Sequence, residues 1–424
     1  MIKNCLAAFG LLLLSFSLQA QEARPLASPM QVDAAENAFT RTMAVQYALL
    51  HSPLITAAQE RIAAARGNLQ SAGAMPPAEV NFGPYFGRDA GQVPVITQTI
   101  EISGRRGARA AVARGELTTT QRESEVTRLD LVRDVSRFYY DLAQSQQALT
   151  LFSEVADIVR RTRDSVKKQV DVGALPTQDI IKAETELARA ESDVVRAQTE
   201  VATRQIALNT LIGRAASSPI VASEPIMFAP VPTDQITLQA LATNRRPELA
   251  AAESRIVAAR ENVRLQRADY RPDLTVSLLQ NTTVNSRDFL NVQSTGVGVG
   301  LVFPLFDTGR IRGRVRQSEA IVREQEANRN QAVLSVLRDV GDAYARVKST
   351  EILVRSYEQN ILPRTQDLLN KAQFGYERGG TTLLEYLEAQ RTYRNTRAEY
   401  LGVLGDNARA RADLERATGQ GLTP

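Results

Sequence analysis

The segment TGVGVGLVFPLF, residues 295–306, carries the strongest structural signal in this sequence. Its apolar side chains occupy every second position, and glycine occupies three of the positions between them. The apolar set is Val297, Val299, Leu301, Phe303 and Leu305, and the glycines are Gly296, Gly298 and Gly300. A period of two predicts a β-strand with one apolar face. Because glycine weakens a strand interior, the opposite face of this strand must meet a different environment.

Two copies of one unit make up the rest of the chain. Residues 53–68 (PLITAAQERIAAARGN) align without gaps onto 247–262 (PELAAAESRIVAAREN), with nine of sixteen positions identical. Further matches, such as RDV at 133–135 over RDV at 338–340, keep the same order in both halves. Self-similarity of this kind indicates a tandem repeat.

The segment between the copies carries four prolines and is predicted to be a non-helical linker that runs extended over the outside of the body. The predicted division is a signal peptide at 1–20, a first repeat at 21–213, the linker at 214–234, a second repeat at 235–419 and a tail at 420–424.

The first twenty residues, MIKNCLAAFGLLLLSFSLQA, have the pattern of a secretory signal peptide. Lys3 precedes an apolar run, and Ala20 stands at the expected cleavage position. Cys5, the single cysteine, lies before that run, so it is not a lipid-anchor cysteine. No later stretch reaches the ~18 consecutive apolar residues of a transmembrane helix. We therefore expect an exported protein that enters a membrane only as a β-barrel.

Composition and motifs argue against several function classes. The 51 basic and 47 acidic residues are dispersed among one another, whereas nucleic-acid-binding proteins gather basic residues on one face. His51 is the only histidine, and the mature chain is expected to hold no cysteine, so we predict neither a metal site nor a cofactor. With no nucleophile–base pattern and no phosphate-binding loop, the sequence does not suggest an enzyme.

Long helices dominate both repeats. In the second copy an apolar residue recurs every seven positions after Arg310, at Val333, Val340, Val347, Val354, Ile361 and Leu368. Heptad spacing predicts a coiled-coil seam, and about 65 residues at 1.5 Å each give a helix of roughly 100 Å. Each copy is therefore predicted as a helix, a strand pair, a very long helix, a glycine turn and a returning helix. The expected strands are 80–87, 95–103, 274–284 and 294–306.

Four strands are too few to close a barrel, for which about eight is the usual minimum. An open sheet with an apolar face would also leave two unpaired edges. We therefore expect three chains to pool their strands into a twelve-stranded barrel, with the apolar positions of 295–306 toward lipid and its glycines toward the lumen. The alternatives are a sandwich-edge strand with glycines under a loop, or a secreted coiled-coil scaffold.

The chain resembles the TolC-like outer membrane efflux proteins over essentially its whole mature length. The resemblance rests on the duplicated PELAAAESRIVAAR block, on PLFDTGRIRGRV after the last strand, and on the C-terminal YERGGTTLLEYLEAQRTYRNTRAEY. QTIEISGRRGARAAVA is similar to the matching stretch of the CzcC-like branch, whose members export divalent cations.

This resemblance implies a homotrimer with a barrel in the outer membrane and a helical tunnel through the periplasm. It also implies a periplasmic adaptor (membrane fusion) protein and an inner-membrane pump of the RND type, so that this chain supplies the exit duct for divalent metal cations or small toxic compounds. The alternative duct function is protein or peptide export in a type I secretion system.

Residues near the periplasmic tip match the gate of the family. Glu385 and Glu388 match the acidic residues that ring the closed end in the family. Three copies of these glutamates would favour cations, and their mutual repulsion would raise the pKa of each carboxyl group. The alternative is that Glu385 and Glu388 only solvate a helix surface. Tyr376 and Asp179 match a hydrogen-bonded latch, whose third member, an arginine, is replaced here by Thr381.

The glycine turns are the last implied site. Gly173, Gly379 and Gly380 match the turns that seat against the adaptor, and they are equally compatible with simple helix C-caps.

Overall fold

The computed structural model describes residues 37–85, 91–283, 291–302, 304 and 306–419. The predicted signal peptide at 1–20, the C-terminal tail at 420–424, Phe303 and Leu305 lie outside the described residues.

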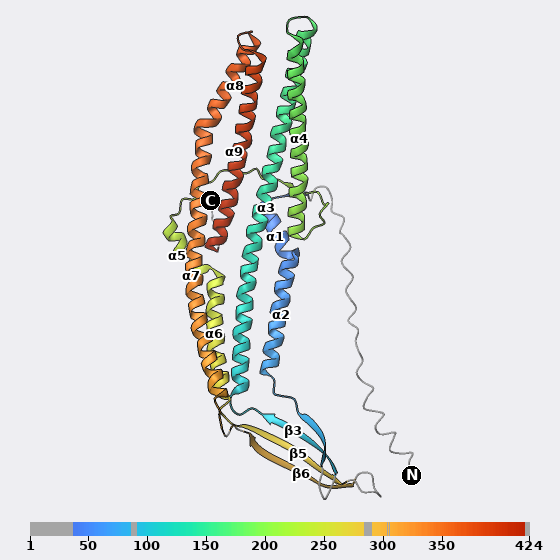
Figure 1. Cartoon of the computed structure of the whole chain (residues 1–424), viewed down its shortest axis with the longest axis vertical. Helices are drawn as coiled ribbons and strands as arrows, with labels where there is room; N and C mark the ends of the chain where they lie inside the picture. Colours follow the sequence, from blue (N-terminus) through green and yellow to red (C-terminus); the bar gives the residue numbers. More distant parts are fainter. Residues whose placement is uncertain (1–36, 86–90, 284–290, 303, 305, 420–424) are drawn as a thin grey trace, which may run out of the picture. The chain divides into compact units, whose positions relative to one another are not determined.

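The fold is mainly α-helical with a small β part, and it repeats one arrangement twice (Figure 1). The first half contains β1 (Ala38–Phe39), α1 (Arg41–His51), α2 (Pro53–Gly73), β2 (Glu79–Tyr85), β3 (Gly91–Ile100), α3 (Arg105–Asp171) and α4 (Thr177–Ile212). The second half contains β4 (Val221–Ala222), α5 (Gln235–Arg245), α6 (Pro247–Ala268), β5 (Asp273–Thr283), β6 (Asn291–Val302), α7 (Arg310–Ser356), a π-helical turn (Tyr357–Ile361), α8 (Leu362–Glu377) and α9 (Leu383–Thr418).

Proline sets the start of two equivalent helices. Pro53 and Pro247 stand at the first positions of α2 and α6, where a missing N–H costs nothing. The residues before them, Ser52 and Arg246, are extended, as the proline ring requires. This break separates a short helix, α1 or α5, from the helix that follows. The sequence-based prediction missed both short helices.

The long helix of the first repeat is continuous, and that of the second is not. Helix α3 runs for 67 residues, which is about 100 Å at 1.5 Å per residue. The equivalent helix, predicted as one element from Arg310 to about Tyr376, is divided into α7 and α8 by the π-helical turn. Pro363 follows directly and has no N–H to donate, so the helical hydrogen-bond ladder is rearranged at this point.

The predicted seams are largely buried. Val340, Val347 and Val354 of α7 are fully buried, whereas Leu368 of α8 is 48% exposed. In the first repeat Val135, Leu142 and Ala156 are buried on α3. The seam of the second repeat therefore opens to solvent in the part of the hairpin beyond the π-helical turn.

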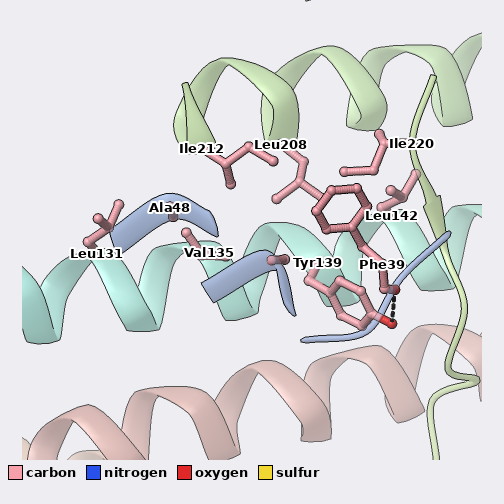
Figure 2. Close-up of a cluster of buried hydrophobic side chains, with 10 residues drawn as sticks. Phe39, Ala48, Leu131, Val135, Tyr139, Leu142, Leu208, Ile212 and Ile220 are labelled. Carbon is pink, nitrogen blue, oxygen red and sulfur yellow. Dashed lines mark hydrogen bonds between the residues drawn. The ribbon is translucent and has the colours of Figure 1, made fainter. Parts of the chain in front are cut away.

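The main core joins both ends of the first repeat (Figure 2). Tyr139 of α3 is 1% exposed, and its hydroxyl donates a hydrogen bond to the carbonyl of Phe39 at 3.1 Å. Ile220 of the linker is buried in the same cluster.

The linker, residues 214–234, contains no helix, as expected. It also buries Ile226 and Val231, so it is packed into the body as well as extended.

One antiparallel sheet has the order β2-β3-β5-β6. Its register places Val80, Ile96, Leu278 and Val297 in one row across all four strands. The adjacent row on the other face holds Glu79, Thr97, Ser277 and Gly298. Successive residues of a strand point to opposite faces, so the sheet has one apolar face. The opposite face is mixed, with threonine, serine and glycine in this row and Val95 and Val302 at other positions on the same face. Among the described residues, neither β2 nor β6 has a strand partner on its outer edge.

None of the described helices combines the length and the apolar character needed to cross a bilayer.

Candidate functional site

Both long hairpins end in the same type of turn. We call α3 with α4 the first hairpin, and α7 and α8 with α9 the second. At the first turn Gly173 has φ +74° and Ala174 donates to the carbonyl of Gln169 at 2.8 Å. At the second, Gly379 has φ +76° and Gly380 donates to the carbonyl of Gly375 at 2.8 Å. These are Schellman C-caps, which glycine favours because it adopts a positive φ without strain.

The three tip glycines differ in backbone conformation. Gly173 and Gly379 have the left-handed conformation, whereas Gly380 does not. A Cβ atom at Gly173 or at Gly379 would meet nothing within 4 Å, so backbone conformation alone requires glycine there. The neighbourhood of these turns is open, and the exposed Val172 stands beside Gly173.

Apolar side chains join the two hairpins next to the turns. Val166 of α3 and Ala183 of α4 form a buried cluster with Leu383, Tyr386 and Leu387 of α9. Tyr376 of α8 stacks on Tyr386 with 5.3 Å between the ring centroids and 7° between the ring planes.

An ion-pair network crosses between the hairpins just beyond this cluster. Glu186 of α4 is 3% exposed, and its Oε2 atom accepts hydrogen bonds from Nε of Arg391, at 3.0 Å, and from Nη2 of the same residue. Nη1 of Arg394 lies 3.9 Å from the other carboxylate oxygen. Both arginines belong to α9, so a buried carboxylate of the first hairpin is held by two cations of the second.

Each arginine of this network has a second acidic partner. Arg391 also donates to Glu388 on its own helix, at 2.9 Å. Arg394 donates to Asp193 of α4 at 3.2 Å. Because a buried charge needs partners to offset its lost hydration, Glu186 is the member of the network that depends most on contact between the hairpins.

Sequence reasoning missed Glu186, Arg391 and Arg394. One signal was present: Glu186 stands on the apolar stripe of α4 formed by Ala183, Leu187 and Ala190, at helical spacing. A charge inside such a stripe indicates a buried partner on another element.

The two glutamates implied by the resemblance have separate local partners. Glu385 occupies the third position of α9 and forms a capping box with Thr382. Hydrogen bonds from the backbone and side chain of Thr382 lower the pKa of Glu385 from its ordinary value. This direction is opposite to that expected for an acidic ring, since a hydrogen bond to the charged form favours ionisation. Glu388 is exposed and pairs with Arg391.

The tyrosine and aspartate of the implied latch are near each other but are not joined by a hydrogen bond. The hydroxyl of Tyr376 is buried without a hydrogen-bond partner among the described residues. Burial, and then the negative charge of Asp179, raise the pKa of Tyr376. Asp179 forms an ion pair with Lys182 at 3.0 Å. Thr381, which replaces the arginine, lies in the turn and donates its backbone N–H to the carbonyl of Gly375 at 3.2 Å.

At the opposite end of the hairpins, the predicted lipid-facing residues share the apolar face of the sheet. Val297, Val299 and Leu301 are 73%, 70% and 58% exposed. Their register partners on β5 are Leu278, Val276 and Leu274, so the neighbouring strand is apolar on the same face.

In the part of the chain that the structure describes, no three His, Cys, Asp or Glu side chains are gathered as ligands of a metal ion. His51 stacks on Tyr47 with ring centroids 4.1 Å apart.

Comparison with known proteins identifies relatives of both halves. The family model described as "Outer membrane efflux protein" matches residues 44–214 and 238–420. Among curated proteins, the cobalt-zinc-cadmium resistance protein CzcC of Cupriavidus metallidurans is 27% identical over 323 residues, which cover 76% of this chain and 75% of that protein. The pyoverdine export outer membrane protein OpmQ of Pseudomonas aeruginosa is 29% identical over 188 residues, or 44% of this chain and 40% of that protein.

Solved structures share the fold over nearly the full length. CusC, described in connection with transmembrane channel formation, has a TM-score of 0.74 at 19% identity and covers 93% of this chain and 96% of its own. The outer membrane protein VceC of Vibrio cholerae has a TM-score of 0.73 at 20% identity and covers 90% of this chain and 96% of its own.

Proposed function

This chain belongs to the outer membrane efflux protein family, and from that premise we propose that three copies form the outer-membrane exit duct of a tripartite efflux system. The observation that carries the proposal is the four-stranded sheet, which has an exposed apolar face and two unpaired edges. Unpaired edges are templates for further pairing. Since β2 and β6 are the two edges, the β2 strand of a second copy can pair with β6 of the first, and three copies give a closed sheet of twelve strands.

The two faces of the sheet suit the two sides of such a barrel. The apolar face, with Val297, Val299 and Leu301, faces outer-membrane lipid. The opposite face, which is richer in threonine, serine and glycine, faces a water-filled lumen. Transmembrane barrels alternate in this way, with apolar residues outward and polar residues inward. The helical hairpins then extend into the periplasm.

The partners follow from the position of the duct. An inner-membrane RND-type pump supplies the energy, and a periplasmic adaptor bridges the pump to the tip turns at Gly173, Gly379 and Gly380. The cargo is divalent metal cations or small toxic compounds. Two observations support a cationic cargo: the similarity to CzcC, a cobalt-zinc-cadmium resistance protein, and the exposed carboxylates Glu385 and Glu388 near the tip.

The tip acts as the gate. The duct is closed while the second hairpin packs against the first through the apolar cluster of Val166 and Ala183 with α9 and through the pairing of Glu186 with Arg391 and Arg394. It opens when α8 and α9 move away from α4, because the apolar cluster and the ion pairs of Glu186 both join the two hairpins. Asp179 and Thr381 stand at the adjoining turns and complete the tip surface.

Matched substitutions on the two faces of the sheet test the duct. Val297→Lys places a charge on the apolar face, and Ser277→Lys places the same charge on the opposite face of the neighbouring strand. A lysine facing lipid near the bilayer centre costs about 2–4 kcal/mol. We expect V297K to lower the amount of detergent-extracted trimer recovered from outer membranes, measured by size-exclusion chromatography with light scattering, while S277K is recovered like the wild type. Equal recovery of V297K and S277K would refute the proposal that the apolar face meets lipid.

A further inference from the structure

The polar face of the sheet carries three carboxylates close to the helical part of the chain. Glu79 begins β2, and Asp273 begins β5, two residues before Thr275. Glu101 follows β3 two residues after Thr99. Register partners and the period of two place all three on the side of the sheet that holds Thr97, Ser277 and Gly298.

Two of these carboxylates are neutralised by the first turns of α3. Arg109 donates to Glu101 at 2.9 Å, and the Glu101 side chain is only 5% exposed. Asp273 lies 3.5 Å from Arg105 and accepts a hydrogen bond from the backbone N–H of Ser103 at 3.3 Å. Both negative charges are therefore offset within the chain.

Glu79 is not offset in this way. It is exposed, and among the described residues it forms no ion pair and no side-chain hydrogen bond. Its row continues across the sheet through Thr97 and Ser277 to Gly298, so its neighbours are short or lack a side chain. The carboxylate therefore extends farther from the sheet than any other group in its row.

The geometry points to Glu79 as a selectivity residue of the duct: we propose that three copies of Glu79 form a fixed anionic ring in the lumen, where sheet and helices meet, and that this ring favours inorganic cations and cationic small molecules over anions. The inference rests on the proposed trimeric duct and names the class of cargo that it favours. With four strands per chain and strands about 4.8 Å apart, successive carboxylates stand roughly 19 Å apart around the barrel wall. The screening length is about 30 Å at 0.01 M salt and about 3 Å at 1 M, so the three fields overlap only at low salt.

Reversal potentials across planar lipid bilayers test the ring. Channels of the wild type, Glu79→Asp, Glu79→Gln and Glu79→Lys are compared in a KCl gradient at low salt. Three charges at about 10 Å from a permeating ion in water, screened at low salt, favour K⁺ about fourfold and disfavour Cl⁻ about fourfold. The ratio of K⁺ to Cl⁻ permeability should therefore fall about 20-fold for E79Q. E79K should lower the ratio further, and E79D should keep the wild-type value because it keeps the charge.

Salt dependence gives an independent check. The difference between the wild type and E79Q should vanish near 1 M KCl, because screening then acts over a few ångströms. Glu385 and Glu388 are present in all four proteins, so their effect on permeation is common to the series. Permeability ratios that do not differ between the wild type, E79Q and E79K would overturn the ring while leaving the duct intact. A wild-type protein that forms no channel at all would overturn the duct, and the ring with it.

Discussion

Neutralising Glu186 tests the proposed gate most directly. The substitution Glu186→Gln keeps the size of the side chain and one acceptor oxygen, but it removes the negative charge that Arg391 and Arg394 share. Glu186 lies on α4 and both arginines lie on α9, so the change weakens a link between the hairpins. It also removes the longer pair of Glu186 with the exposed Arg189 on α4, at 3.7 Å, and a pair of this kind contributes little to helix stability.

The magnitude follows from the burial of the partners. Removing one member of a fully buried ion pair costs about 3–5 kcal/mol. Here the side chain of Glu186 is 4% exposed but that of Arg391 is 29% exposed, and Arg391 retains its bond to Glu388. We therefore expect a loss near the lower part of the range for hydrogen bonds to charged groups, about 2 kcal/mol. At 1.4 kcal/mol per tenfold change, this shifts the balance between packed and separated hairpins by about 30-fold.

Single-channel recording in planar lipid bilayers measures that shift as an increase in open probability. The matched control is Glu191→Gln, the same substitution five residues further along α4. Glu191 pairs with Arg160 of α3 at 3.2 Å, within the first hairpin, and both side chains are about half exposed. An exposed pair of this kind contributes about 0–1 kcal/mol, so E191Q should open no more often than the wild type.

Two outcomes would refute this reasoning. If E186Q and E191Q raise the open probability equally, the effect comes from charge on α4 and not from contact between the hairpins. If neither differs from the wild type, the pairing of Glu186 with α9 does not hold the tip closed.

Two further predictions concern local structure. Gly213→Val should lower the melting temperature, measured by circular dichroism, far more than Gly173→Ala. Both glycines have a positive φ, so both substitutions strain the backbone. A Cβ atom at Gly213 would also lie 2.7 Å from the carbonyl oxygen of His51, whereas a Cβ atom at Gly173 would meet nothing within 4 Å. Glu385 has a lowered pKa in the folded chain, so its capping contribution is fully present above the ordinary pKa and is lost as pH falls through the folded value. Hydrogen-exchange protection at the start of α9 should therefore fall below about pH 4.5 in the wild type and should not depend on that carboxyl group in Glu385→Gln.

Much of the architecture could be predicted because it is recorded in local periodicity. The alternation at 295–306 reports a strand, heptads report long packed helices, and Pro247 marks a helix start, since each reflects the geometry of a few adjacent residues. The glycine turns are of the same kind, because Gly173 and Gly379 have the positive φ that ends a helix in a Schellman cap.

Only the tertiary structure decided which charges matter. Glu186 and Arg391 are 205 positions apart, and no spacing rule joins residues at that distance, so their pairing depends on how two hairpins align. Glu79, Glu101 and Asp273 look alike as acids, and they differ only because Arg105 and Arg109 reach two of them. The break at 357–361 is intermediate: Pro363 was visible in the sequence, but the rearrangement of the hydrogen-bond ladder into a π-helical turn depends on the helix it interrupts. Sequence periodicity therefore determined the helices and strands. Long-range packing determined which charged side chains are paired within the chain and which remain available for function.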